Sequence, residues 1–229
     1  MGALGIFGGT IDPFHRAHLG LIEAALTNGF VDRLRVIPAG QPPHRPPPVA
    51  SATHRLAMVR AGIKDLPNAL QTRTEIDPAE VDTQAPSYTA QTLERLRAEL
   101  GAEQPLALIL GADAFLGLPT WHRWREITKL THLLITARPG QQLTPEAMPA
   151  ELRAWWLAGA GSTAADLGSA PAGHIASFTM PESPLSATAI RQQLQSRPNP
   201  SSANPLALNP LLPAGVVRYI RGHHLYELS

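Results

Sequence analysis

The architecture can be worked out from one segment, GIFGGTIDPFHRAH, which spans residues 5–18. An apolar run at residues 4–7 has the composition of a short buried strand, and two glycines follow it directly. Apolar residues then recur at helical spacing through residues 16–26. A strand, a glycine turn and a helix in this order are typical of the first unit of a parallel α/β sheet.

The rest of the chain repeats this alternation. Apolar runs predict further strands at residues 34–38, 70–76, 106–110, 132–136 and 174–180. Helical spacing predicts helices at residues 53–63, 87–100, 186–195 and 216–220, and one around 152–156. Because strands that alternate with helices pair in parallel through right-handed crossovers, we expect an α/β fold. It should be a Rossmann-like doubly wound parallel sheet with helices on both faces and a small helical C-terminal portion.

We expect residues 1–229 to form a single domain, since this length is ample for one core. Residues 197–210 are rich in Pro, Asn and Ser and predict a flexible linker before the C-terminal helix. Residues 42–48 form a proline-rich loop that cannot join a ladder. Residues 141–173 mix one helix with a loop rich in Gly, Ala and Ser, and movement of both loops over a ligand is plausible.

Composition excludes several classes of protein. Apolar residues make up 44% of the chain and the net charge is +1, which argues against a disordered chain and a general nucleic-acid binder. The chain has no cysteine, which excludes disulfides, thiolate nucleophiles and cysteine zinc sites. The N-terminus lacks a basic region, and the longest apolar stretch, residues 106–118, is interrupted by Asp113. We therefore expect a cytoplasmic protein without a membrane or nucleic-acid partner.

The glycine turn is a candidate phosphate site. Gly8 and Gly9 carry no side chain that would keep a phosphate from the backbone, and the following helix offers free N–H groups and a positive dipole end. Asp12 and Pro13 resemble an N-cap followed by proline at the first helical position. The helix could equally begin a few residues later.

His15 and His18 are the candidate catalytic groups of this segment. Their spacing of three places both rings on one side of a first helical turn, where imidazoles can donate hydrogen bonds to charge that develops in a transition state. The plain structural alternative is a simple turn with two surface histidines. A P-loop and a His-Glu-x-x-His motif are absent, and the loose dinucleotide pattern at residues 159–164 follows a helix rather than a strand.

A second candidate phosphate site lies at residues 186–191, SATAIR. Ser186 is a plausible N-cap, and Arg191, one turn later, can clamp a phosphate with two parallel hydrogen bonds. Taken alone, the segment is equally well an ordinary capped amphipathic helix.

Together the two segments resemble the nucleotidyltransferase superfamily, with its His-x-Gly-His and Ser-x-Thr-x-x-Arg signatures. Further segments look like bacterial nicotinate-nucleotide adenylyltransferases, and they occur in the same order. They are PPHR at 42–45, PSYT at 86–89, GAD at 111–113, PTW at 119–121, RPG at 138–140, LLP at 211–213 and LY at 225–226. The resemblance covers nearly the whole chain.

The resemblance implies a reaction in NAD biosynthesis. ATP would give its adenylyl group to nicotinate mononucleotide, and the products would be deamido-NAD and pyrophosphate. The phosphate of the acceptor attacks the α-phosphorus of ATP, so catalysis rests on positioning and on charge neutralisation rather than on an enzyme nucleophile. Mg²⁺ is expected, held mainly by the ATP phosphates and water rather than by a protein metal site.

The resemblance also implies roles for particular residues. Three are catalytic: His15, His18 and Arg191. The ATP site comprises Gly8, Gly9, Thr10, Phe14, His18, Gly111, Asp113, Ser186, Thr188 and Arg191. The acceptor site comprises Arg45, Thr89, Trp121 and Arg138, with Thr89 at the pyridine carboxylate and Trp121 stacked on the pyridine ring. Structural alternatives stay open: Trp121 as core, Thr89 as a helix start, Asp113 as a cap and Arg45 as a solvated charge.

Two departures from the family pattern matter, and one further change is mild. Ala17 stands where the family has glycine in His-x-Gly-His, Ala39 and Gly40 replace a pair that often contains asparagine, and Ala187 is a mild change. Within the superfamily, the rival acceptors are nicotinamide mononucleotide, phosphopantetheine and an alcohol phosphate in cytidylyl transfer. Ala17 favours a silent nucleotide-binding protein, and the absence of a Lys-Met-Ser-Lys-like run disfavours an aminoacyl-tRNA synthetase fragment. The sequence carries no signal for an oligomeric state.

Overall fold

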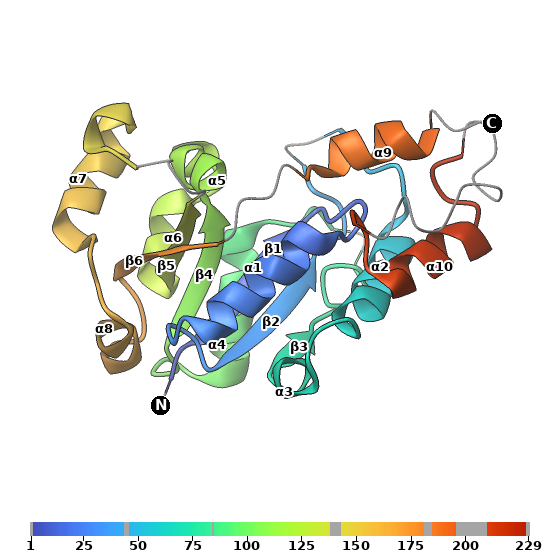
Figure 1. Cartoon of the computed structure of the whole chain (residues 1–229). Coiled ribbons are helices and arrows are strands. Elements are labelled where there is room, and N and C mark those ends of the chain that lie inside the picture. Colours follow the sequence, from blue (N-terminus) through green and yellow to red (C-terminus); the bar gives the residue numbers. More distant parts are fainter. Residues whose placement is uncertain are drawn as a thin grey trace.

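The computed structural model describes residues 2–43, 46–83, 85–137, 143–180, 185–195 and 210–227. Within these ranges, parallel strands form one six-stranded sheet with the order β3-β2-β1-β4-β5-β6 (Figure 1). The strands are β1 Leu4–Gly9, β2 Arg33–Pro38, β3 Thr74–Ile76, β4 Leu106–Gly111, β5 His132–Ala137 and β6 Ile175–Thr179. This order is that of dinucleotide-binding doubly wound sheets, so the Rossmann-like prediction is confirmed.

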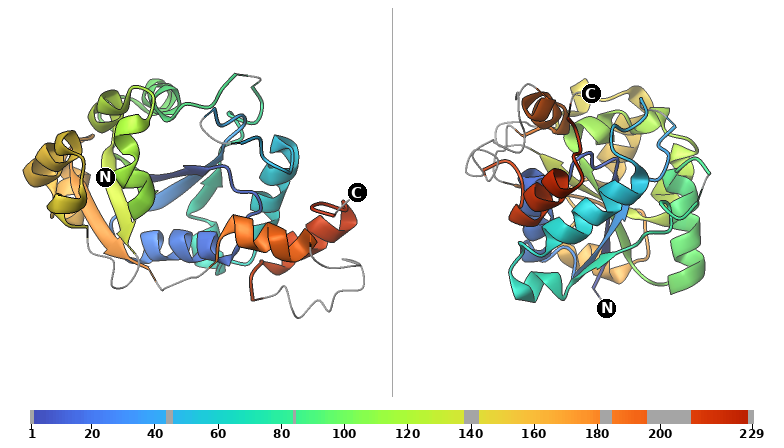
Figure 2. Two further views of the ribbon diagram at one scale, coloured as in Figure 1. Left: turned by 90° about the horizontal axis from the view of Figure 1, so that it is seen from above. Right: turned by 90° about the vertical axis from the view of Figure 1, so that its right-hand side faces the viewer.

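Helices cover both faces of the sheet. Their bounds are α1 Arg16–Thr27, α2 Ala52–Ile63, α3 Asn68–Gln71, α4 Thr89–Leu100, α5 Ala112–Leu116, α6 Trp124–Leu130, α7 Ala150–Gly159, α8 Ala164–Ser169, α9 Ala187–Gln195 and α10 Ala214–Gly222, with 3₁₀ turns η1 Leu118–Thr120 and η2 Pro145–Ala147. Figure 2 shows α1 and α9 on one side of the sheet and the helices between residues 89 and 130 on the other. Among the described residues, no helix has the length and apolarity needed to cross a bilayer.

The central strand β4 explains the long apolar run in the sequence. Ala107 and Ile109 pack into the cluster that holds α1, α2 and α10. Leu106, Leu108 and Leu110 pack into the cluster that holds α4, α5 and α6. Because successive side chains of a strand point to opposite faces, a strand covered on both sides must be apolar at every position.

The predicted secondary structure was wrong or incomplete in three places, one of which is the helix α6, which was not predicted. Residues 70–76 were predicted as one strand, but α3 extends to Gln71 and β3 begins only at Thr74. The helix α8 lies within a segment that was predicted as loop. It is held by a reciprocal cap, in which Thr163 accepts from the backbone N–H of Asp166 and the Asp166 carboxylate accepts from the N–H of Thr163.

The linker predicted at 197–210 lies outside the described residues except for Pro210, and the single-domain organisation stays a prediction. The C-terminal helix is confirmed as α10, which packs against α2 (Figure 1). Glycines allow this close approach: a Cβ at Gly215 would lie 2.6 Å from the carbonyl oxygen of Ala61. Likewise a Cβ at Gly62 would lie 2.3 Å from the ring of Phe14, so α2 also packs tightly against the segment before α1.

Candidate active site

A cavity of about 880 Å³ opens at the carboxyl ends of β1 and β4. These two strands are neighbours, and the strand order reverses between them, which is where open α/β sheets bind ligands. The volume is in the range of clefts that hold small molecules. The sequence-predicted residues that line it are Gly8, Gly9, Thr10, His15, His18, Thr89, Gly111, Asp113, Trp121, Thr188 and Arg191.

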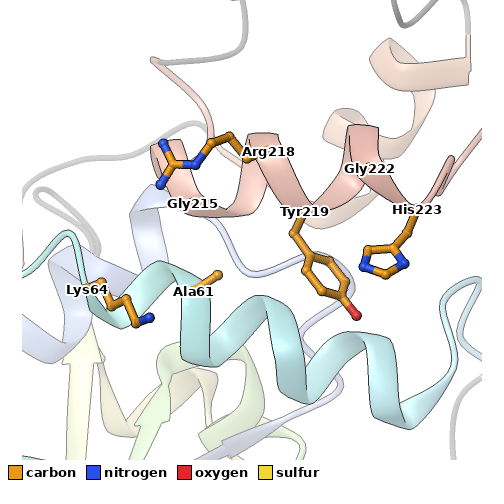
Figure 3. Close-up of a pocket in the computed structure, with 7 residues that line it drawn as sticks. All are labelled: Ala61, Lys64, Gly215, Arg218, Tyr219, Gly222 and His223. Carbon is orange, nitrogen blue, oxygen red and sulfur yellow. The ribbon is translucent and has the colours of Figure 1, made fainter.

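A second hollow of about 370 Å³ lies on the outside of the molecule, between α2 and α10 (Figure 3). Lys64, Arg218, Tyr219 and His223 contribute side chains to it. None of the residues predicted as functional lies there, so the larger cavity is the candidate site.

The glycines of the larger cavity are not explained by packing. A Cβ at Gly8 would come within 3.5 Å of the carbonyl oxygen of Ile37, and one at Gly9 within 3.7 Å of the side chain of Ile11, which are ordinary contacts. A Cβ at Gly111 would meet nothing within 4 Å. The fold therefore tolerates a methyl group at these positions, whereas a ligand that touches the backbone would not.

The two histidines lie at the start of α1, side by side. His15 is the N-cap residue and His18 the third helical residue, so the helix begins at the later of the two starts considered and Asp12 is not its cap. The backbone N–H of His15 donates to Nδ1 of His18 across 3.1 Å, and the two rings stack with centroids 3.7 Å apart. Both rings line the cavity, as the spacing of three predicted.

Both histidines are neutral at pH 7. Burial lowers the pKa of His15 to about 4. Burial, with His15 as a neighbour, also lowers the pKa of His18 well below its usual value. Because Nδ1 of His18 accepts a hydrogen bond from the backbone, its proton resides on Nε2. His18 therefore keeps one N–H donor on the ring atom that is not used by the helix start.

Phe14 and Ser186, both described by the structure, are not among the residues that line the cavity. Phe14 is fully buried and stacks on His18, with ring centroids 5.3 Å apart, so it supports that imidazole from the core side. The hydroxyl of Ser186 accepts from the backbone N–H of Ala189 across 3.2 Å, as the predicted N-cap does. Both residues act on the geometry of their neighbours in this structure.

Arg191 of α9 reaches the same end of the cavity as the histidines. Its Nη1 donates to the main-chain oxygen of Asp12 across 2.6 Å, and its Nη2 donates to the hydroxyl of Thr188 across 3.2 Å. The side chain is thus held on two sides while it still lines the cavity. Two segments far apart in the sequence meet here, as the paired signatures predicted.

Sequence reasoning missed the buried role of Asp12, which is only 3% exposed. Its carboxylate accepts from the backbone N–H groups of Val49 and Ala50, at 2.8 and 3.3 Å, and from the hydroxyl of Tyr226 at 2.6 Å. The one available signal was Tyr226, which belongs to the closing LY segment of the family resemblance.

Sequence reasoning also missed Arg55, which is 1% exposed. Its guanidinium donates to three main-chain oxygens, those of Thr10 at 2.6 Å, Gly40 at 2.8 Å and Ala50 at 3.2 Å. Burial lowers its pKa, but an arginine keeps its charge in proteins. The buried guanidinium of Arg55 therefore joins the main chain of the glycine loop, at Thr10, to the segment that follows β2, at Gly40.

Aromatic rings also line the cavity. Thr89 is the first residue of α4, and Trp121 follows η1 and packs partly against the core cluster around α4. The rings of Tyr88 and His122 lie 4.5 Å apart and line the same wall. Asp113 is exposed at the rim, in the first turn of α5. The predicted acceptor residues Arg45 and Arg138 lie outside the described residues.

The backbone of Glu80, a residue that also lines the cavity, explains why position 40 is glycine. A Cβ at Gly40 would lie 1.9 Å from the carbonyl oxygen of Glu80, so any side chain at position 40 would collide with that backbone. Glu80 is held in place by Thr92, whose hydroxyl donates to its carboxylate across 2.6 Å, and burial raises its pKa. Ala17, the other departure, lines the cavity from α1.

The doubly wound sheet, the glycine loop before α1 and the arginine of α9 define a nucleotidyltransferase of the cytidylyltransferase-like class, and the family model described as cytidylyltransferase-like matches residues 6–193. Within that class, the chain belongs to the nicotinate-nucleotide adenylyltransferase family. It is 45% identical over 226 residues to a protein of Dechloromonas aromatica (strain RCB) named probable nicotinate-nucleotide adenylyltransferase, covering 99% of this chain and 98% of the other.

Two further comparisons agree with this family. A protein of the same name from Pseudomonas putida (strain W619) is 40% identical, with 98% of this chain and 94% of the other covered. Among solved structures, the nicotinic acid mononucleotide adenylyltransferase of Plasmodium falciparum, complexed with NaAD, matches with a TM-score of 0.71. That match covers 99% of this chain and 98% of the other at 13% identity, so it shows a shared fold.

Proposed function

We propose that this chain transfers the adenylyl group of ATP to nicotinate mononucleotide, giving deamido-NAD and pyrophosphate. An oxygen of the acceptor phosphate forms the new bond to the α-phosphorus, and the bond to the β-phosphate oxygen breaks as pyrophosphate leaves. The observation that carries the proposal is that His15, His18 and Arg191 line the same cavity as Thr89 and Trp121.

The part of the cavity lined by His15, His18 and Arg191 suits the triphosphate of ATP. The start of α1 directs the positive end of its dipole toward these residues, and Nε2–H of His18 is available to an oxygen of the reacting phosphate. Arg191, fixed by Asp12 and Thr188, would hold the β- and γ-phosphates, which become the leaving group. A neutral imidazole retains one N–H, which can donate a hydrogen bond to a phosphate oxygen.

The part of the cavity lined by Thr89 and Trp121 suits the pyridine nucleotide. The backbone N–H groups at the start of α4, together with the hydroxyl of Thr89, would meet the pyridine carboxylate. Trp121 would stack on the pyridine ring. Arg45 and Arg138 stay in the proposal as further acceptor residues on the strength of the family resemblance.

Mg²⁺ is part of the proposal. Within the described ranges, no group of three acidic or histidine side chains is arranged to hold a metal ion, and Asp113 is a single exposed carboxylate at the rim. This donor set fits an ion that arrives on the ATP phosphates and keeps water ligands. When bound, Mg²⁺ would neutralise charge on the phosphate oxygens.

The test is pyrophosphate release from ATP and Mg²⁺, with nicotinate mononucleotide and nicotinamide mononucleotide supplied separately. We expect strong release with the acid and little with the amide. Equal release would keep the reaction but contradict carboxylate recognition at Thr89. Binding of ATP without release from either acceptor would contradict the proposal and favour a silent nucleotide-binding protein, with Ala17 as the cause.

A further inference from the structure

Tyr226, in the segment after α10, is a buried residue of the core. It is 5% exposed and lies in the core cluster beside α2 and α10. Its backbone has a φ of 66°, a left-handed conformation that residues other than glycine seldom adopt. Such a conformation persists when surrounding contacts hold it, and here the hydroxyl of Tyr226 donates to the carboxylate of Asp12 across 2.6 Å.

Asp12 connects Tyr226 to Arg191, which lines the cavity. Its carboxylate is held by three donors, namely Tyr226 and the backbone N–H groups of Val49 and Ala50. A side chain anchored in this way fixes the position of its own main-chain oxygen. That oxygen accepts the 2.6 Å hydrogen bond from Nη1 of Arg191.

Tyr226 itself does not touch the cavity, since it is not among the described residues that line it, whereas Asp12 and Arg191 both do. We propose that Tyr226 is a positioning residue for adenylyl transfer, acting through Asp12 to set the direction of the Arg191 guanidinium. This inference rests on the proposed function, because Arg191 matters only where ATP is bound and pyrophosphate leaves. It gives the C-terminal segment a part in turnover beyond packing.

The chain offers a matched control. Tyr219 of α10 also donates or accepts one hydrogen bond through its hydroxyl, to Nδ1 of His54 at 3.0 Å, but at the outer hollow between α2 and α10. Tyr226→Phe and Tyr219→Phe each remove one hydroxyl and leave the ring in place. The two variants differ in whether the lost hydrogen bond leads to Arg191.

The experiment compares kcat, the KM for each substrate and thermal unfolding for wild type and both variants. We expect Tyr226→Phe to lower kcat by about tenfold, because a misdirected clamp fails to stabilise the leaving group. The KM for nicotinate mononucleotide should stay within about twofold, and Tyr219→Phe should keep the wild-type kcat. Equal kcat in the two variants overturns the proposal, as does unfolding of Tyr226→Phe below the assay temperature, since the hydroxyl would then serve the fold alone.

A double-mutant cycle separates positioning from packing. Arg191→Lys keeps a positive charge but loses the fork that bonds Asp12 and Thr188 together. If Tyr226 acts through Arg191, adding Tyr226→Phe to Arg191→Lys should lower kcat by less than about threefold. A full tenfold loss in that background overturns the proposal. Wild type is assayed first, so failure of the proposed function shows as an inactive wild type and failure of this inference as an active one with additive variants.

Discussion

His15 and His18 are joined by a hydrogen bond from the backbone N–H of His15 to Nδ1 of His18, with their rings stacked 3.7 Å apart. The helix start thereby selects which nitrogen of His18 carries the proton. Backbone and side chain are thus coupled at the point where the phosphate chemistry is proposed to occur.

Replacing His18 should cut turnover far more than it weakens acceptor binding. We expect kcat of His18→Ala to fall by about 100-fold or more while the KM for nicotinate mononucleotide changes little. In an asparagine the side-chain oxygen lies near the Nδ1 position, and in a glutamine the amide nitrogen lies near the Nε2 position. Steady-state kinetics should therefore show more activity for His18→Gln than for His18→Asn. The reverse order would assign the catalytic contribution to helix capping, and near-normal turnover of all three would remove His18 from catalysis.

Stability should fall in mild acid. The pKa of His15 drops from its usual 6.5 to about 4 on folding, so between these pH values the unfolded chain binds more protons than the folded one. Stability is fully present above pH 6.5 and is lost as the pH falls toward about 4. Between pH 7 and pH 5, denaturant unfolding of wild type should lose about 2 kcal/mol more than His15→Asn, whose side chain keeps a good N-cap. Parallel losses in the two proteins would contradict the buried neutral state of His15.

Trp121→Ala should act on the acceptor. We expect its KM for nicotinate mononucleotide to rise about fivefold or more, with kcat less affected, because the stacking surface for the pyridine ring is lost. Trp121→Phe, which keeps an aromatic face, is the control and should recover part of the affinity. An unchanged KM in the alanine variant would assign the ring to packing against the core cluster around α4.

Two glycine substitutions should affect different properties of the protein, one its stability and the other its binding of ATP. Gly40→Ala puts a methyl group 1.9 Å from the backbone oxygen of Glu80, so we expect it to lower the free energy of unfolding by about 2 kcal/mol or more. Gly111→Ala meets nothing within 4 Å and has an ordinary φ of −68°, so its stability should stay near wild type. Because Gly111 lines the cavity, its KM for ATP should rise instead. Thermal unfolding and kinetics of both variants check this pair, and a stable Gly40→Ala protein would show that the Glu80 segment can move.

The parts of the site that the sequence predicted are those in which neighbouring residues determine one another. The strand, the glycine turn and the helix of residues 5–18 are local, so the spacing of His15 and His18 was enough to place both rings on one side. The continuous apolar run at residues 106–110 predicted a strand buried on both faces. Short segments in the same order as in the family predicted the family, and the relatives confirm it.

Tertiary structure alone decided which polar groups hold those loops in position. Asp12 looked like a helix cap, yet its partners are Val49, Ala50 and Tyr226, and the last is 214 residues away. Arg55 lies in a segment for which the sequence predicted only a helix, yet it is buried on three main-chain oxygens. A buried polar group is stable only where partners surround it, and those partners come from distant parts of the chain. Periodicity reports which face of an element is buried, whereas the identity of the hydrogen-bond partner depends on where each segment packs.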